Sequence, residues 1–177
     1  MSPAFLFPGQ GSQTVGMGDD LFAQFPEEVA EANEILGYSL SDLCINGPEE
    51  QLGQTQFTQP ALYLVSYLHA QAINRDEGIP AMAAGHSVGE FAALAFAGAF
   101  TFSDGLKMVA KRGEIMSQVS GGGMAAVIAL EASRIQEVFA SNGFTGIDLA
   151  NFNSPGQIVI SGPAAEISES LAPLKEA

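Results

Sequence analysis

The stretch IPAMAAGHSVGEFAALAFAG, residues 79–98, decides how this chain folds. Residues 79–84 form a short apolar run typical of a strand, and residues 88–97 are alanine-rich and favour a helix that ends at Gly98. Between them lies the pattern Gly-x-Ser-x-Gly, centred on Ser87. Between a strand and a helix this pattern is the nucleophile elbow, a tight turn that holds a serine hydroxyl at a helix N-terminus. We therefore predict an α/β fold with Ser87 as its catalytic nucleophile.

The same motif also allows a simpler interpretation, a glycine-rich turn with a serine that only caps the helix. A serine nucleophile needs a base, and the chain contains two histidines, His69 and His86. His86 is adjacent to Ser87, so the two side chains should diverge around the turn, and His69 is expected at the polar edge of an upstream helix. In this architecture the histidine follows the serine along the chain. None follows Ser87 here, so we expect the base to lie in a missing C-terminal piece.

A second glycine-rich loop follows a short first strand that Pro8 closes. Residues 7–13 read FPGQGSQ, with a glycine on each side of Gln10. The glycines would let this backbone approach a ligand, and the Gln10 N–H could stabilise an oxyanion. A phosphate-binding loop has a different glycine spacing. A plain turn remains the simplest alternative.

Arg112 is the most informative charged residue. On the helix predicted from Ser103 to about residue 119, its neighbours three and four positions away are all apolar: Met108, Val109, Ile115 and Met116. An arginine on an apolar stripe must extend to solvent or meet an anion. Two interpretations stay open, a structural salt bridge with one of the many carboxylates, or a bidentate fork for a substrate carboxylate.

Composition narrows the functional classes. The 177 residues carry a net charge of −14 with only six Lys and Arg, which argues against nucleic acid and anionic membrane surfaces as partners. The single cysteine, Cys44, excludes an internal disulfide and a cysteine metal cluster, and we expect it in the core. No apolar run is long enough for a membrane span, and the N-terminus lacks the features of a signal peptide. We expect a cytoplasmic protein without a metal.

The glycine triplet at residues 121–123 marks the boundary between two predicted regions, 1–122 and 123–177. The second region reads as strand, helix, strand, strand and helix at residues 124–130, 131–142, 147–150, 157–161 and 164 onward. This order is that of a ferredoxin-like unit without its last strand. We therefore expect an incomplete piece of a longer protein.

Helical patterns in the first region give three more expectations. Residues 19–36 have helical spacing throughout. Thr58 should cap a helix with Pro60 at its first position, and Ser103 should cap the helix that carries Arg112.

Taken together, the motifs resemble the malonyl-CoA:acyl carrier protein transacylase family, and most closely the discrete, trans-acting acyltransferases of polyketide synthases. They occur in family order: FPGQGSQ at 7–13, TQPAL at 58–62, GHSVGE at 85–90, KRGEIM at 111–116 and NFNSPGQIVISG at 151–162. The resemblance implies an α/β-hydrolase-like large subdomain with a parallel sheet and an inserted ferredoxin-like subdomain, here truncated before its last strand. The family's catalytic histidine falls beyond Ala177.

The resemblance also implies a role for each site residue. Ser87 would be acylated, the N–H groups of Gln10 and Val88 would form the oxyanion hole, and Arg112 would pair with the malonyl carboxylate. His86 would line the pocket beside Ser87, and Asn153 would lie near the cleft.

The expected reaction moves a malonyl group from coenzyme A to the phosphopantetheine thiol of an acyl carrier protein, for polyketide or fatty acid synthesis. No cofactor is bound, because malonyl-CoA is a substrate and the partner carries the phosphopantetheine. The alternatives are an acyl hydrolase that clears carrier proteins, or an inactive fragment that needs a C-terminal fragment of the same protein.

Overall fold

The computed structural model describes residues 3–177, and the chain divides into two compact units. The first unit extends to Gln118 and the second spans Val119–Ala177. The glycine triplet at 121–123 follows this division, and strand β3 begins at its second glycine, Gly122. Each unit has its own hydrophobic core.

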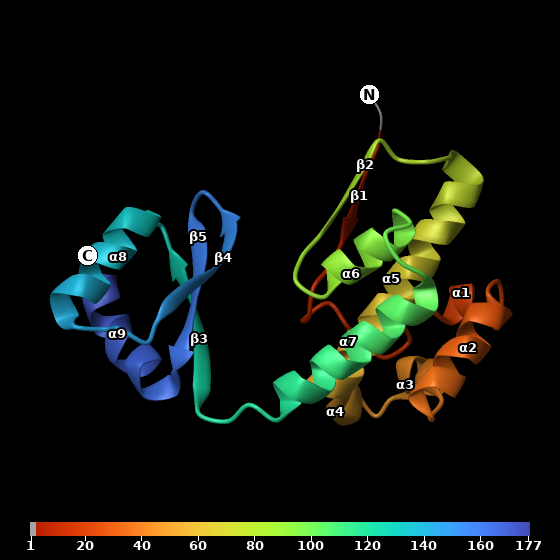
Figure 1. The fold of residues 1–177 in the computed structure, drawn as a ribbon, viewed down its shortest axis with the longest axis horizontal. Helices are drawn as coiled ribbons and strands as arrows, with labels where there is room; N and C mark the ends of the chain where they lie inside the picture. The colour runs from red at the N-terminus through yellow and green to blue at the C-terminus, as the bar shows by residue number, and fades with distance from the viewer. Residues whose placement is uncertain (1–2) are drawn as a thin grey trace. The chain divides into compact units, whose positions relative to one another are not determined.

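The first unit is mainly helical and has a small two-stranded parallel sheet (Figure 1). Its strands are β1 (Ala4–Phe7) and β2 (Met82–Gly85), and its helices are α1 (Asp19–Phe22), α2 (Pro26–Leu36), α3 (Leu40–Asn46), α4 (Glu49–Leu52), α5 (Thr55–Glu77), α6 (Gly89–Phe96) and α7 (Phe102–Ser117). Strands β1 and β2 are parallel neighbours, with Phe7 opposite Gly85 at their ends. The first glycine-rich loop and the serine turn therefore leave the sheet at the same edge.

Helix α5 differs from its prediction. It begins at Thr55, so Thr58 is not its cap and Pro60 lies inside the helix. Instead, the buried Thr58 hydroxyl donates to the Leu52 carbonyl at 2.6 Å. Pro60 removes one backbone hydrogen bond, but residues 61–65 directly after it are all buried, and this packing retains the helix.

Two other helix starts were also predicted wrongly. The cap of α7 is Thr101 rather than Ser103: the Thr101 hydroxyl accepts from the Asp104 N–H at 3.1 Å and donates to the Asp104 carboxylate at 2.8 Å. This reciprocal pair fixes the first turn two residues earlier than expected. The stretch 19–36 is two helices, because Pro26 begins α2 as a first-turn proline.

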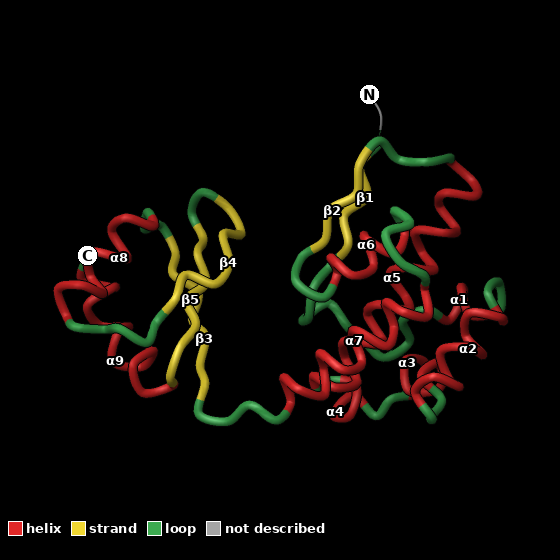
Figure 2. Tube along the Cα trace, in the orientation of Figure 1, coloured by secondary structure: helices red, strands yellow, loops and turns green. Residues whose placement is uncertain are grey.

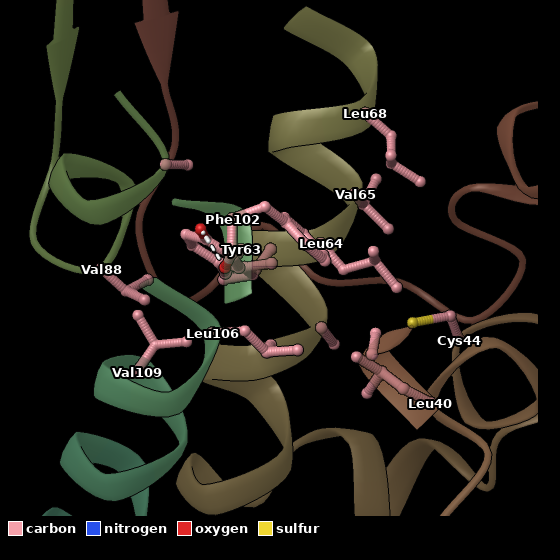
Figure 3. Close-up of a cluster of buried hydrophobic side chains, with 14 of the residues drawn as sticks. Leu40, Cys44, Tyr63, Leu64, Val65, Leu68, Val88, Phe102, Leu106 and Val109 are labelled. Atoms are coloured by element: carbon pink, nitrogen blue, oxygen red, sulfur yellow. Dashed lines mark hydrogen bonds between the residues drawn. The ribbon is translucent and has the colours of Figure 1, made fainter. Parts of the chain in front are cut away.

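The core of the first unit packs α5 against residues of α1, α3, α6 and α7, and Figure 3 shows part of it. Fully buried Tyr63 stacks on Phe102 with ring centroids 5.5 Å apart, and its hydroxyl donates to the Phe102 carbonyl at 2.8 Å. Leu106 and Val109 of α7 are also fully buried. Cys44 is buried and unpaired in the same cluster, which confirms the expectation from the sequence. The face of α5 and α7 that holds the site is thus anchored in a packed core.

The second unit is a three-stranded antiparallel sheet with two helices over one face (Figures 1 and 2). Its elements are β3 (Gly122–Ile128), α8 (Ala132–Asn142), β4 (Asp148–Ser154), β5 (Gln157–Pro163) and α9 (Ala164–Glu176). The strand order is β3-β5-β4, as in a ferredoxin-like unit whose last strand is lacking. The predicted fold class is confirmed. No helix within residues 3–177 is long and apolar enough to cross a membrane.

Candidate active site

Ser87 lies in a sharp turn between β2, which ends at Gly85, and α6, which begins at Gly89. Its backbone φ is 53°, in the left-handed region that a residue with a side chain rarely adopts. The half-buried serine is therefore held in strained geometry, as in a nucleophile elbow.

The elbow packs tightly against itself and against the end of β1. A Cβ atom added to Gly85 would overlap the backbone of Gly89 and Glu90. A Cβ atom on Gly89 would overlap the carbonyl oxygens of Phe7 and Pro8. Both positions require glycine for close approach.

Arg112 of α7 reaches the elbow. Its Nη2 donates to Ser87 Oγ at 3.1 Å, and its Nη1 donates to Gln59 Oε1 at 2.6 Å. The guanidinium carbon also lies 5.9 Å from the centre of the Phe91 ring. Across residues 3–177, no ion pair joins Arg112 to a carboxylate, so the salt-bridge interpretation of this residue is not observed.

Burial lowers the pKa of the half-buried Arg112 guanidinium from its usual value, and the nearby Glu90 carboxylate acts in the opposite direction. A guanidinium remains protonated in proteins despite such a shift. The site thus presents a positive charge directly beside the Ser87 hydroxyl. The surrounding α7 stripe is only partly covered: Val109 is buried, whereas Met108, Ile115 and Met116 are exposed.

The first glycine-rich loop lies against the elbow. The His86 N–H donates to the Phe7 carbonyl at 2.9 Å, and the ring of the exposed His86 lies beside Gly9. The Gln10 side chain donates from Nε2 to Thr55 Oγ1 at 3.1 Å.

Both predicted oxyanion donors have uncommitted backbone N–H groups. Val88 is the N-cap residue of α6, and its side chain is buried. Within the described chain, no backbone hydrogen bond uses the N–H of Gln10 or of Val88. These groups are consequently available to a ligand oxygen, and their role as an oxyanion hole remains a prediction.

Asn153 and His69 are the remaining residues considered from the sequence. Asn153 lies on β4 in the second unit, where its Nδ2 donates to Gln157 Oε1 at 2.9 Å. His69 is exposed on α5. No group of His, Cys, Asp and Glu side chains in the described residues could hold a metal ion.

Two side chains that contact the site were not assigned from the sequence. Gln59, fully buried, bonds Arg112, and Thr55 bonds Gln10. They lie one turn apart on the same face of α5. Gln59 lies in the TQPAL motif at 58–62, but no local pattern assigned it a role.

Comparison with known families decides the relationship, because the model of the acyl transferase domain matches residues 4–177. The chain belongs to the acyl transferase domain family. This acyl transferase domain is 59% identical over 165 residues to the polyketide biosynthesis protein ThaF of Burkholderia thailandensis, covering 93% of the chain and 14% of ThaF. It is 49% identical over 164 residues to BaeC of Bacillus velezensis, a polyketide biosynthesis malonyl CoA-acyl carrier protein transacylase, covering 92% of the chain and 57% of BaeC.

Solved structures agree with this assignment. The malonyl CoA-acyl carrier protein transacylase of Burkholderia pseudomallei superposes with a TM-score of 0.91 at 48% identity, over 97% of the chain and 60% of that protein. A malonyl-transacylase in complex with its type II polyketide synthase acyl-carrier protein, PlMCAT:AntF, gives a TM-score of 0.88 at 38% identity, over 98% of the chain and 59% of that protein. The chain spans 14% of ThaF, 57% of BaeC, and 60% and 59% of the two solved structures.

Proposed function

We propose that the protein transfers a malonyl or related carboxyacyl group from coenzyme A to the phosphopantetheine thiol of an acyl carrier protein, for polyketide or fatty acid synthesis. The observation that carries the proposal is the 3.1 Å hydrogen bond from the Arg112 guanidinium to Ser87 Oγ. A cation beside the nucleophile is matched to an acyl group that itself ends in a carboxylate. An uncharged acyl group would leave the half-buried guanidinium without an anionic partner.

The reaction would proceed in two transfers. Ser87 Oγ attacks the thioester carbonyl as a base accepts the hydroxyl proton, and the N–H groups of Gln10 and Val88 stabilise the oxyanion. The C–S bond then breaks, and coenzyme A leaves as the protonated thiol. In the second half, the carrier thiol gives its proton to the base and attacks the seryl ester, the C–O bond breaks, and Ser87 Oγ takes up the proton as it is released.

Neither histidine of this chain is suited to act as the base. The ring of His86 lies beside Gly9, and His69 is exposed on α5. The chain matches only part of its longer relatives. We infer that the base comes from a segment equivalent to the unmatched part. A C-terminal fragment of the same protein is the partner that could supply it.

The proposed partners follow from the relatives' names. BaeC is named a malonyl CoA-acyl carrier protein transacylase, and PlMCAT is described in complex with an acyl-carrier protein. Because the chain carries a net charge of −14, its docking to a carrier protein would depend on local contacts rather than on overall electrostatic attraction. The single, buried thiol is compatible with the cytoplasm, which is where we place the protein.

The decisive experiment is to incubate the full-length protein with malonyl-CoA and measure its intact mass. We expect one malonyl group per chain on Ser87, transfer of that group to an added holo carrier protein, and neither in Ser87→Ala. Absence of both modifications in the wild-type protein would contradict the proposal.

An acyl hydrolase of the same fold is the second candidate, because an elbow serine also serves hydrolysis. A hydrolase that clears various acyl groups has no need of Arg112 beside its nucleophile. The rates of carrier acylation and of malonate release, measured on one sample, distinguish the two. Faster release than transfer would favour the hydrolase.

A further inference from the structure

We propose that Gln59 is a positioning residue that fixes the guanidinium of Arg112 and thereby sets the preference for carboxylated over uncharged acyl groups. The inference rests on the function proposed above. It concerns a residue of α5 whose side-chain amide hydrogen-bonds Arg112 and Met116.

Only one orientation of the Gln59 amide group is compatible with its contact to Arg112. A guanidinium has only donors, so the atom that meets Arg112 Nη1 at 2.6 Å must be the amide oxygen. The amide nitrogen is then directed to Met116, whose sulfur it meets at 3.2 Å. Both ends of the fully buried amide are thus occupied by residues of α7.

This arrangement determines which donors of Arg112 remain for substrate. With Nη1 held by Gln59, Nη2 is directed at Ser87 Oγ. The Phe91 ring lies 5.9 Å from the guanidinium carbon and limits its movement on another side. A guanidinium held in this way loses less conformational freedom when a carboxylate binds.

The neutrality of the amide is as important as its position. A carboxylate at this point would pair with Arg112 and repel the carboxylate of an incoming malonyl group. Glutamine supplies an acceptor without a negative charge, so the positive charge stays available to the substrate.

Close helix packing keeps the two residues in register. A Cβ atom added to Gly113, next to Arg112, would lie 3.0 Å from the Thr55 carbonyl oxygen and 3.1 Å from the Gln56 Cα atom. The backbones of α5 and α7 therefore meet at this point, one turn before Gln59. The contact fixes the distance that the Gln59 side chain has to span.

The test compares Gln59→Met and Gln59→Glu with wild type in the full-length protein, and follows Ser87 acylation by malonyl-CoA and by acetyl-CoA on the same preparation. The ratio of the two rates is the readout, because a smaller folded fraction lowers both rates equally. Gln56→Met is the matched control: Gln56 is also on α5, but its side chain accepts a hydrogen bond from Ser117 of α7, whereas Gln59 accepts from Arg112.

We expect both Gln59 variants to lower the malonyl-to-acetyl ratio by roughly tenfold or more, the effect of losing or neutralising one charge-assisted hydrogen bond. Gln59→Glu should do so with acetyl transfer retained. Gln56→Met should leave the ratio unchanged.

An unchanged ratio in both Gln59 variants, with wild type fully active, would overturn the positioning role and leave the proposed function intact. If the wild-type protein takes up neither acyl group, the proposed function itself fails. The two failures are therefore distinguishable in one experiment.

Discussion

At the scale of single residues, the site combines a strained serine with a partly desolvated cation. A left-handed backbone costs an L-residue about 1–2 kcal/mol, and Ser87 has a φ of 53°. The tight packing at Gly85 and Gly89 imposes this conformation. In this conformation the Ser87 hydroxyl accepts a hydrogen bond from Arg112 at 3.1 Å.

Replacement of Ser87 by glycine should therefore stabilise the fold relative to replacement by alanine. We expect the free energy of unfolding of Ser87→Gly to be larger than that of Ser87→Ala by about 0.5–1 kcal/mol, because glycine tolerates positive φ. Denaturant titration measures the difference. At helical Ser66 of α5 the order should reverse, and the same order at both sites would contradict the strain argument.

Cys44 gives a prediction about alkaline pH. Burial raises the pKa of its thiol from 9.0 to about 12. The unfolded chain therefore loses this proton at lower pH than the folded one, so the contribution to stability is complete below about pH 9 and falls as pH rises toward about 12. The difference in free energy of unfolding between wild type and Cys44→Ala should shrink over that range. A difference that does not change with pH would contradict this role of Cys44.

At the scale of elements, the strands and most helices follow from the sequence, whereas several helix starts do not. The turn at residues 85–89 was predictable because its glycines are required by close backbone approach. The start of α5 was not, since burial of the apolar residues after Pro60 overrides the usual preference of proline for a first turn. The start of α7 was missed because Thr101 and Ser103 both have capping side chains, and only the pairing with Asp104 distinguishes them.

The same reasoning separates what was predictable in the site. Ser87 and Gln10 were marked by glycine spacing, and Arg112 by its apolar neighbours. Gln59 carries no such mark, because its function depends on which residue of another helix it meets. Contacts between helices require three-dimensional packing that no local pattern contains.

Position 89, where α6 meets the end of β1, should not tolerate a side chain. We expect Gly89→Ala to destabilise the chain by about 3 kcal/mol, because the new methyl group would overlap the Phe7 and Pro8 carbonyl oxygens. Gly156→Ala is the control, since nothing lies within 4 Å of its added Cβ, and should change stability by less than about 0.5 kcal/mol. Thermal and denaturant unfolding measure both. Equal effects would refute the steric explanation.

The cap of α7 should affect stability without affecting selectivity. Loss of the Thr101 hydroxyl in Thr101→Ala should cost about 1 kcal/mol in the free energy of unfolding. Thr101→Ser, which keeps the hydroxyl, should restore most of it. The ratio of malonyl to acetyl transfer in the full-length protein should not change, and a changed ratio would show that the cap also orients Arg112.

At the scale of the whole molecule, the chain contains two separate cores. Ile135 is fully buried in the second and Leu106 in the first. Ile135→Ala should destabilise residues 119–177 by about 3 kcal/mol and lower amide hydrogen-exchange protection there, while α5 and α7 stay protected. Leu106→Ala should give the opposite pattern. Equal loss of protection in both units would show a single cooperative unit.

The aromatic composition of the two units has a practical consequence. The chain has no tryptophan and three tyrosines, and all of them, Tyr38, Tyr63 and Tyr67, belong to the unit that carries Ser87. Intrinsic tyrosine fluorescence from this chain therefore reports only on that unit. The rings of Tyr63 and Tyr67 lie 5.5 and 5.0 Å from the Phe102 ring at the start of α7, so two of the three emitters sit beside the helix that carries Arg112.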